Sequence, residues 1–98
     1  MTEFEASVLE YIKKIPKGKL TTYANIAKAI GHPGAARAVG NALNKNPWAP
    51  KVPCHRVVKS NGAIGGYAQG VKTKVKYLGQ EGVIVRQGKV VGFKEKLM

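Results

Sequence analysis

The sequence contains a single cysteine, Cys54, which is followed directly by a histidine and an arginine in Pro53-Cys54-His55-Arg56. The thiolate is the reactive form of cysteine, and nearby positive charge lowers the pKa of the thiol. His55 and Arg56 are neighbours of the kind that do this. In an extended strand, however, successive side chains point to opposite faces. A Cys54–His55 pair therefore requires a bent backbone, which Pro53 and the flanking loops favour.

The composition leaves two interpretations of this cysteine. A single cysteine excludes an intramolecular disulfide, and one thiol with two histidines makes a poor zinc site. Cys54 is then either a small buried core residue or a nucleophile. Composition by itself favours the core residue, whereas the adjacent histidine and arginine favour the nucleophile. Taken alone, His55 would more often be structural than catalytic.

The charge of the chain indicates a polyanionic partner. Lysine and arginine number 17 against 5 acidic residues, which leaves a formal net charge of +12. Such an excess is typical of proteins that bind nucleic acid or an acidic membrane surface. No lysine-rich helix with a broad aromatic and leucine face is visible, so nucleic acid is favoured over membrane. The remaining explanation is that the charge serves solubility alone.

Length and targeting signals set the broad class. The 98 residues suffice for one hydrophobic core, so a single domain spanning 1–98 is expected. No apolar run approaches the roughly 18 residues of a membrane span. The first residues, MTEFEASVLEYIKK, are acidic and then amphipathic, which is not typical of a signal peptide. We expect a protein of the cytoplasm, associated with the nucleoid, or of the nucleus.

The first segment predicts an amphipathic helix. Thr2 and Glu5 have the spacing of a capping box, and Pro16 and Gly18 end the pattern. The apolar residues that recur at helical spacing are Phe4, Val8, Tyr11, Ile12 and Ile15.

The next two predicted helices have the layout of a helix-turn-helix. One begins after Thr21 or Thr22 and is stopped by Gly31. Pro33 is well placed to open the other. Two short helices joined by so brief a connection predict a helix-turn-helix at about 22–44.

The later of these helices, predicted to run to about Leu43, has one apolar and one polar face. The polar face carries Arg37, Gly40, Asn41 and Asn44 at three- and four-residue steps. A glycine inside a helix lowers helix stability by about 1 kcal/mol relative to alanine, so Gly40 does not stabilise its own helix. A smooth face with one projecting arginine suits close approach to a DNA groove, and the layout and charge favour this over a merely solvated face.

The second half of the chain predicts loops, one helix and a hairpin. An irregular, proline-rich and then glycine-rich active-site segment spans 46–70, with a short strand at Val57 and Val58. A helix follows from Val71 to Gly79 or Gly82, and a β-hairpin at about 83–93 has Gln87-Gly88 at its tip. The predicted fold is mainly α with a small β-hairpin, a winged-helix-like domain containing a helix-turn-helix.

Several motifs together resemble one known family. The motifs are PCHRV, VKSNGAIGGYAQG with a later EG, TTYANIAKAIG, PGAARAVGNAL and NKNP, in this family's order. Between Phe4 and Val91 the chain resembles the C-terminal domain of the O6-alkylguanine-DNA alkyltransferases, the methylated-DNA–protein-cysteine methyltransferases. The resemblance implies DNA repair by irreversible, stoichiometric transfer of an alkyl group from O6-alkylguanine to Cys54. The chemistry implied needs base flipping but no metal and no cofactor.

The resemblance also implies catalytic roles. Cys54 is the acceptor thiolate, and His55 is its general base through a bound water. Glu81 matches the acid that orients this histidine, although from the residues alone it would be a solvated carboxylate at a helix end. Asn46 matches the asparagine that braces the active-site turn, and otherwise reads as a turn residue before Pro47.

Substrate and DNA contacts are implied in the same way. Tyr23, otherwise a core candidate, matches the tyrosine near the flipped base and its phosphate, and Val57 a backbone carbonyl that contacts the guanine amine. Tyr67 and Ala68 match the loop that closes over the base, although Tyr67 could instead anchor the loop by packing. Arg37 matches the arginine that fills the vacated place in the stack. The remaining predicted DNA contacts are Gly40, Asn41 and Arg56.

The implied partner is double-stranded DNA that contains O6-alkylguanine, with O4-alkylthymine as a second candidate lesion, bound by a monomer. Many family members carry an N-terminal domain ahead of this one, so the chain is a minimal catalytic domain or a fragment of a larger fusion. Gln69 stands where relatives often have a small glycine in the substrate loop. The larger side chain argues against tolerance of bulky alkyl groups but leaves the basic chemistry unaffected. The alternatives are an alkyltransferase-like lesion sensor, a class that commonly has tryptophan in place of the cysteine, and a winged-helix transcription factor with an inert cysteine.

Overall fold

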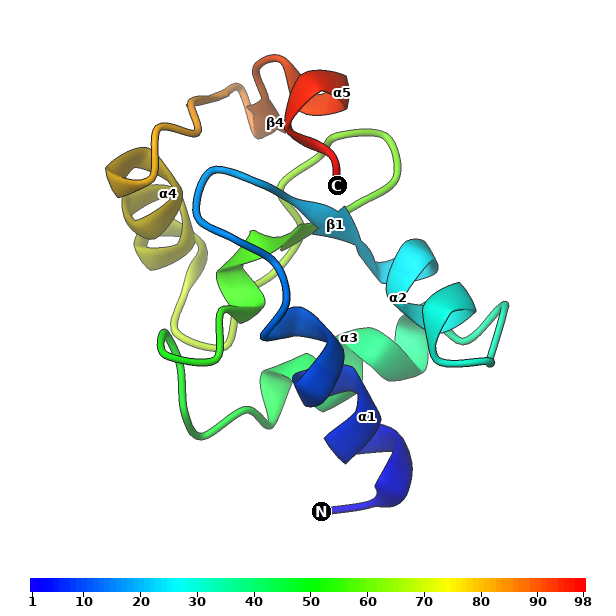
Figure 1. Ribbon diagram of the computed structural model, residues 1–98. Helices are drawn as coiled ribbons and strands as arrows, with labels where there is room; N and C mark the ends of the chain where they lie inside the picture. Colours follow the sequence, from blue (N-terminus) through cyan, green and yellow to red (C-terminus); the bar gives the residue numbers. More distant parts are fainter.

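The first half of the domain is a three-helix unit, seen in the computed structural model, which describes all residues 1–98 (Figure 1). Its helices are α1 (Glu3–Ile12), α2 (Tyr23–Ala29) and α3 (Ala36–Asn44). The predicted capping box is confirmed, because the backbone N–H groups of Thr2 and Glu5 each donate to the other's side chain at 2.8 and 3.1 Å. Thr22 caps α2 by accepting from Asn25 at 3.0 Å. The helices bury their apolar faces against one another in a cluster that we call the first core cluster. It consists of Val8, Leu9, Ile12, Ile15, Ile26, Ala27, Val39, Ala42, Leu43, Val52, Cys54 and Val57.

Two helix boundaries differ from the prediction. The first helix ends at Ile12 rather than near Pro16, and Ile15 reaches the core through a turn, with its N–H donating to the carbonyl of Ile12 at 3.1 Å. Pro33 does not open α3. Gly34 adopts φ +88°, which no helical residue can have, so the helix begins only at Ala36 and the turn after α2 is longer than expected.

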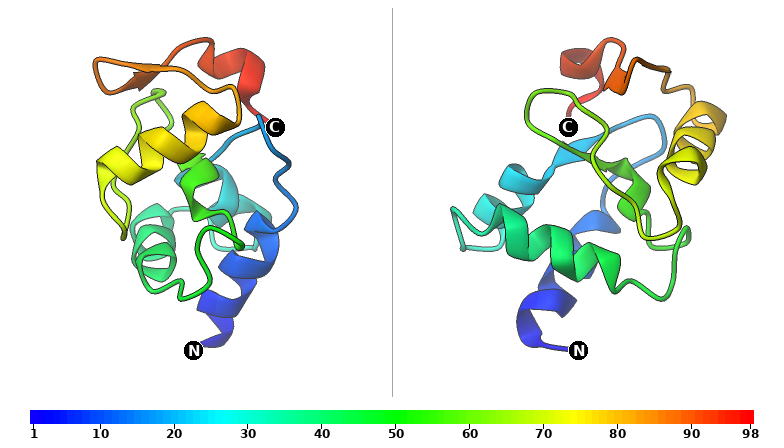
Figure 2. Two further views of the ribbon diagram at one scale, coloured as in Figure 1. Left: turned by 90° about the vertical axis from the view of Figure 1, so that its left-hand side faces the viewer. Right: turned by 180° about the vertical axis from the view of Figure 1, so that it is seen from behind.

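A short parallel strand pair joins the two halves of the chain. β1 (Thr21–Thr22) pairs with β2 (Val57–Val58), and β2 follows directly from the single 3-10 turn η1 (Cys54–Arg56). The strand at 57–58 was predicted, but its partner was not. Because side chains alternate along a strand, Val57 packs into the first core cluster and Val58 into a second one. The second core cluster consists of Leu20, Val58, Ile64, Leu78, Val83 and Val90. η1 contacts both α1 and α4, and Figure 2 shows it inside the domain.

The second half is built from α4 (Val71–Gln80), the hairpin strands β3 (Val85–Arg86) and β4 (Lys89–Val90), and the short helix α5 (Phe93–Lys96). The hairpin tip at Gln87-Gly88 is confirmed. Both tip residues have positive φ, +50° and +76°, as a two-residue hairpin turn requires. The hairpin is shorter than the predicted range 83–93, and the helix α5 already begins at Phe93.

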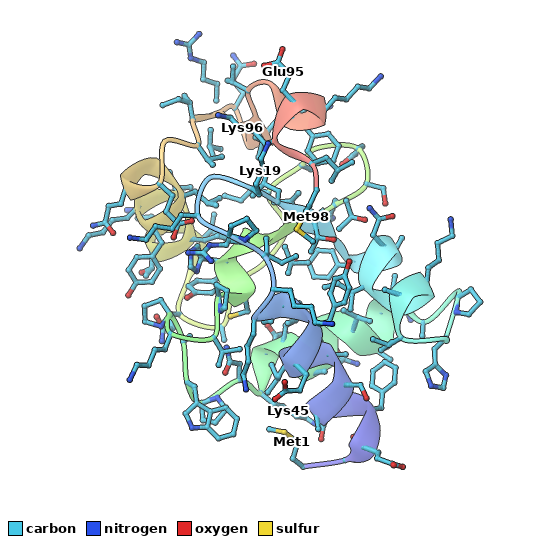
Figure 3. All side chains as sticks on the ribbon, in the orientation of Figure 1. Met1, Lys19, Lys45, Glu95, Lys96 and Met98 are labelled. Carbon is cyan, nitrogen blue, oxygen red and sulfur yellow. The ribbon has the colours of Figure 1, made fainter.

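The C-terminal residues return to the centre of the domain. The backbone N–H of Met98 donates to the carbonyl of Leu20 at 2.9 Å, just before β1. Figure 3 places Lys19, Lys96 and Met98 together, and Lys45 beside α1, where it pairs with Glu5 at 2.9 Å. None of the helices has the length and apolar character needed to cross a membrane.

Candidate active site

The reactive candidate, Cys54, begins the 3-10 turn between the two cores. Pro53 precedes it, and the turn bends the chain before β2, as the Cys54–His55 hypothesis required. The cysteine is 4% exposed and belongs to the first core cluster. The residue is therefore packed as the core interpretation predicts, and its role as a nucleophile stays a prediction.

Those polar groups are not the ones predicted. Burial raises the pKa of the Cys54 thiol, and Asn46, Lys74 and Tyr67 oppose the rise. The single positive charge among them is Lys74. The expectation that His55 and Arg56 lower this pKa is wrong, because burial dominates and the charge comes from α4. In the resting protein Cys54 is a neutral thiol that needs a base.

His55 has one ring nitrogen that is free to accept a proton. Its Nε2 lies 3.0 Å from Glu81 Oε2, and since a carboxylate only accepts, Nε2 carries the proton. Nδ1 therefore holds the free lone pair, and it is buried without a hydrogen-bond partner. Burial lowers the pKa of His55 although Glu81 opposes this shift. The imidazole is thus neutral at neutral pH, with its accepting nitrogen unoccupied.

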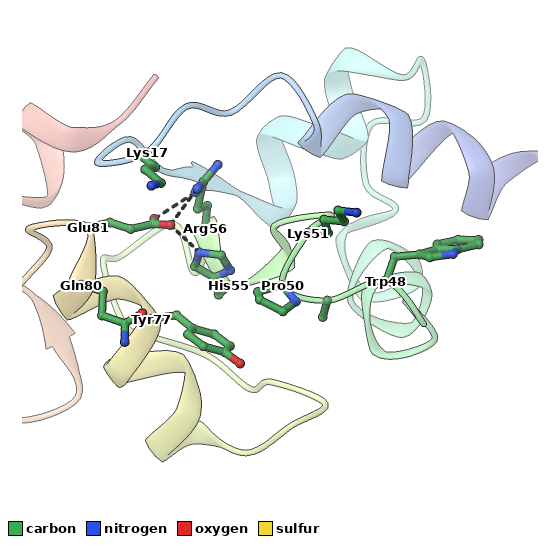
Figure 4. Close-up of a pocket in the computed structure, with 10 residues that line it drawn as sticks. Lys17, Trp48, Pro50, Lys51, His55, Arg56, Tyr77, Gln80 and Glu81 are labelled. Atoms are coloured by element: carbon green, nitrogen blue, oxygen red, sulfur yellow. Dashed lines mark hydrogen bonds and ion pairs between the residues drawn. The ribbon is translucent and has the colours of Figure 1, made fainter.

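Glu81 is the hub of an ion-pair network rather than a solvated carboxylate. Arg56 donates to both of its oxygens, from Nε to Oε1 at 2.9 Å and from a terminal nitrogen to Oε2 at 2.7 Å (Figure 4). Burial alone would raise the pKa of Glu81, but the hydrogen bonds from Arg56 and His55 outweigh it and the pKa is lowered. Glu81 therefore stays ionised and fixes the orientation of His55.

The side chain of Arg56, which was expected to contact DNA, is largely engaged inside the protein. Its third nitrogen donates to the carbonyl of Ile15 at 2.6 Å, and the side chain is 12% exposed. Three of the five N–H groups of the guanidinium are bound in this way, and the contact with DNA stays a prediction. Arg56 ties α4 to the segment after α1.

This network forms one wall of the largest hollow on the surface, of about 510 Å³. Figure 4 shows Tyr77 and Gln80 of α4 on one side, and Pro50, Lys51 and Trp48 on the other. This hollow shares no lining residue with a smaller groove beside α3, which is lined by Tyr23, Gly40 and Asn41 among others. His55 therefore lines the hollow and not the groove.

Asn46 braces the turn that precedes Cys54, in the place where the resemblance puts it. Its amide donates to the carbonyl of Val52 at 2.8 Å, and its side-chain oxygen accepts from the backbone N–H of Trp48 at 2.9 Å. The side chain closes the irregular loop on itself and is buried. These contacts hold the chain entering Cys54 in one conformation.

The substrate-side candidates gather around Tyr23. Its ring lies between Gly40 of α3 and Gly65 of the glycine-rich segment 60–70, which we call the glycine loop. A groove of about 260 Å³ opens there. Any side chain at Gly65 would be strained, because the residue has φ +72° and a Cβ would lie 2.9 Å from the Tyr23 hydroxyl. Tyr23 is half-buried and packs on the first core, so it is both a core and a groove residue.

Tyr67 and Ala68 lie on the loop that follows this groove, and Ala68 is exposed. The Tyr67 ring packs edge-on against Tyr77 at 6.3 Å and on the first core, so the packing role holds. Its hydroxyl is buried without a partner, and Tyr67 is one of the groups that lower the pKa of Cys54. Tyr67 therefore lies near the thiol.

Lys74 is the site residue that sequence reasoning missed. It is completely buried on α4, and its Nζ donates to the carbonyls of Val57 and Ile64, each at 2.6 Å. Val57, predicted as a substrate contact through its carbonyl, is therefore already an acceptor, with one lone pair left. The missed signal is positional, since Lys74 occupies the apolar stripe with Val71, Val75 and Leu78 at helical spacing.

The predicted DNA-contact residues of α3 share one outer surface. Arg37 and Asn41 are exposed, and Gly40 is half-buried beside Tyr23. Asn41 and Asn44 line the groove with Tyr23, so this surface and the groove are continuous.

Comparison with known proteins gives a consistent assignment. Residues 3–83 match the family described as "6-O-methylguanine DNA methyltransferase, DNA binding domain". A methylated-DNA–protein-cysteine methyltransferase of Methanosarcina acetivorans is 53% identical over 81 residues, 83% of this chain and 52% of the relative. One from Shigella flexneri is 44% identical over 84 residues, 86% of this chain and 49% of the relative. The chain spans about half the length of these curated relatives.

Solved structures include one relative of similar length. Mycobacterium tuberculosis OGT in complex with DNA superposes with a TM-score of 0.81 at 44% identity, covering 83% of this chain and 50% of that chain. S. pombe Atl1 in complex with damaged DNA containing O6-carboxymethylguanine gives 0.88 at 33% identity and covers 100% of this chain and 96% of that chain.

Proposed function

Because the chain belongs to the 6-O-methylguanine DNA methyltransferase family, we propose that it repairs DNA by transferring the alkyl group of O6-alkylguanine to its own Cys54. The observation that carries the proposal is the Cys54–His55–Glu81 arrangement. The neutral thiol of Cys54 is followed in the same 3-10 turn by a neutral imidazole whose accepting nitrogen is free, and the other nitrogen of that imidazole is held by a carboxylate. Such an arrangement activates a nucleophile.

The proposed reaction is a displacement at the alkyl carbon. His55 takes the thiol proton through a bound water, the sulfur attacks, a C–S bond forms and the bond from carbon to O6 breaks. The guanine, which remains in the DNA strand, takes up the proton that His55 removed from the thiol, so the proton count balances. The resulting thioether has no evident route back, which makes each protein molecule react once.

Access to the lesion requires base flipping. The O6 atom lies within a base pair, so the nucleotide must leave the stack before a buried sulfur can reach its alkyl group. The groove beside Tyr23 is the proposed entrance, with the exposed face of α3 on the duplex. The net charge of +12 supplies the attraction for phosphates. OGT and Atl1, which superpose on the chain, are both seen in complex with DNA.

Stoichiometry tests this proposal. A duplex carrying O6-methylguanine is mixed with increasing amounts of the protein, and the lesions that remain are counted at completion. We expect one lesion repaired per protein molecule, since the acceptor is consumed. Sustained repair beyond one equivalent would refute self-alkylation, because a turning-over enzyme does not use up its cysteine.

A lesion sensor that binds without transfer is the second candidate. The observation in its favour is that Atl1 matches nearly the whole of this chain in length. Cys54 argues against it, since the sensor class commonly has tryptophan at this position. The titration separates the two functions, because a sensor would leave every lesion intact while retaining the damaged duplex.

Arg37 is proposed to fill the gap left by the flipped base. Arg37→Ala should then raise the activation free energy for repair of duplex DNA by a few kcal/mol at most. The rate measured from the bound complex should fall by up to about a hundredfold. The rate on the free O6-methylguanine base should change much less, because a free base needs no flipping.

Arg86→Ala is the matched control for this experiment, since it removes the same charge from the exposed hairpin. We expect it to weaken duplex binding only, with recovery at low salt. Equal losses on duplex and free base in Arg37→Ala would mean that Arg37 shapes the active site instead.

Gly40 offers a separate test of the α3 surface. Gly40→Ala should stabilise the free protein by up to about 1 kcal/mol in chemical denaturation, because alanine favours helix and the new methyl meets Tyr23 at an ordinary 3.8 Å. The methyl would narrow the groove, so we expect weaker binding of the lesion duplex. At Gly79 of α4, an added Cβ would have no atom within 4 Å. Gly79→Ala should therefore raise the free energy of unfolding in the same way but leave the binding of the lesion duplex unchanged. Equal binding by both variants would exclude close approach at Gly40.

A further inference from the structure

The last part of the chain, residues 84–98, pairs with the glycine loop, and we call it the C-terminal segment. The backbone N–H of Ile64 donates to the carbonyl of Gly88 at 2.9 Å. The N–H of Val90 donates to the carbonyl of Gly62, also at 2.9 Å, and an antiparallel bridge lies between these two bonds. Figure 1 shows the segment, coloured orange to red, beside the green loop. The hairpin therefore holds the first part of the glycine loop as a neighbouring strand would.

An aromatic side chain fixes the same pairing. A Cβ added at Gly62 would lie 3.2 Å from Cγ of Phe93, so the ring lies directly against the backbone of the loop. Gly62 also has φ +84°, a conformation that favours glycine. The ring of Phe93 packs at the same time on the second core cluster, which contains Ile64 and Val90. Phe93 thus joins the loop, the hairpin and the core at one point.

The other end of the C-terminal segment is tied to the strand that leads to Tyr23. The N–H of Leu20 donates to the carbonyl of Lys96, and the N–H of Met98 donates to the carbonyl of Leu20, each at 2.9 Å. Leu20 directly precedes β1, and β1 continues into Tyr23, the first residue of α2. Tyr23 lines the groove together with Gly66 of the glycine loop. The segment therefore connects two parts of the chain that form the groove.

We propose that the C-terminal segment sets the shape of the substrate groove, with Phe93 as the positioning residue that holds the glycine loop in place relative to Tyr23. The family match covers residues 3–83, so the segment lies outside it. The inference rests on the proposed function, because the glycine loop is the one expected to close over the flipped base. Its physical claim, that Phe93 orders the loop, concerns the free protein.

The first experiment needs no DNA and compares Phe93→Ala with the wild type by amide hydrogen exchange, residue by residue. We expect the amides of Ile64 and Val90 to exchange about tenfold faster relative to the amides of α1, because local opening of the pairing no longer has to displace the ring. Phe93→Leu should restore most of the protection, since leucine keeps an apolar side chain against Gly62.

Val75→Ala is the matched control, because Val75 packs on the same second core cluster from α4. It should lower the stability of the domain without singling out the loop amides. If Phe93→Ala does not fold, Gly62→Ala perturbs the contact from the side of the loop, since its methyl group must displace the ring. Exchange of Ile64 and Val90 that rises no more than that of α1, in whichever variant folds, overturns the claim that Phe93 orders the loop.

The second experiment measures alkyl transfer from O6-methylguanine as the free base and within a duplex. We expect Phe93→Ala to slow both single-turnover rates by a similar factor, up to about a hundredfold, because a displaced loop misplaces the base in either case. The affinity for undamaged duplex should not change, and Phe93→Leu should recover most of the rate. Weaker duplex binding with unchanged rates overturns the proposal, because Phe93 would then serve DNA contact. Absence of transfer in the wild type, with the exchange results as expected, refutes only the proposed function.

Discussion

Cys54→Ala is expected to abolish alkyl transfer completely while leaving the affinity for duplex DNA unchanged. The sulfur is the only thiol of the chain, so no second acceptor can replace it. Because burial raises the pKa of this thiol, it is neutral in the resting protein, and its removal takes no charge from the DNA-binding surface. Repair of a methylated duplex and fluorescence anisotropy with the same duplex measure the two quantities.

Cys54→Ser is the control for this prediction. A hydroxyl keeps the size and polarity of the site but is far less readily ionised than a thiol. We expect no transfer from the serine variant either, and tight binding of the lesion duplex by both variants. Residual transfer in Cys54→Ala would place the acceptor elsewhere, and lost affinity would mean that the cysteine holds the groove in shape.

His55→Gln is expected to slow transfer about 100- to 10,000-fold at neutral pH, the usual contribution of a general base. Glutamine can still donate to Glu81, so the network with Arg56 should survive. The neutral thiol would then have no acceptor for its proton. Single-turnover rates from the bound complex measure the effect, and the methyl group should still be found on Cys54.

The pH dependence separates a general base from a structural histidine. Burial lowers the pKa of His55 below its usual value, so the wild-type imidazole remains neutral and active into mildly acidic solution. Without the base only the thiolate reacts, and its fraction rises about tenfold per pH unit below the raised pKa of Cys54. The deficit of His55→Gln should therefore shrink as the pH rises. His32→Gln, at the other histidine of the chain, should match the wild type, and a deficit independent of pH would exclude the base role.

The elements that carry local signals were predictable from the sequence. The capping box at Thr2, the stop at Gly31 and the hairpin tip at Gln87-Gly88 each depend on residues close in sequence. The boundaries that failed did so for equally local reasons. Gly34 takes a left-handed conformation, which moved the start of α3 beyond Pro33.

The site was predictable in its residues but not in its electrostatics. The motif around Cys54 and the resemblance brought out His55, Glu81 and Asn46, and the structure places all of them around the active-site turn. The charges were misassigned because pairing depends on tertiary contact. Arg56 is adjacent to Cys54 in sequence but binds Glu81, 25 positions away.

The burial of Lys74 could not be predicted from the sequence. Lysine is almost always exposed, so a lysine within an apolar stripe does not by itself indicate a buried cation. Only the fold shows that backbone carbonyls from β2 and the glycine loop converge on its Nζ. The pairing of β1 with β2 was missed for the same reason, since its two strands lie far apart in the chain.

The central claim, that the chain alkylates its own Cys54, is tested most directly by intact mass. The wild-type protein is weighed before and after incubation with an excess of duplex DNA containing O6-methylguanine, and then digested to locate the change. We expect the addition of a single methyl group, on the peptide that contains Cys54, with no second addition on longer incubation. An unchanged mass while lesions are bound or removed would contradict self-alkylation.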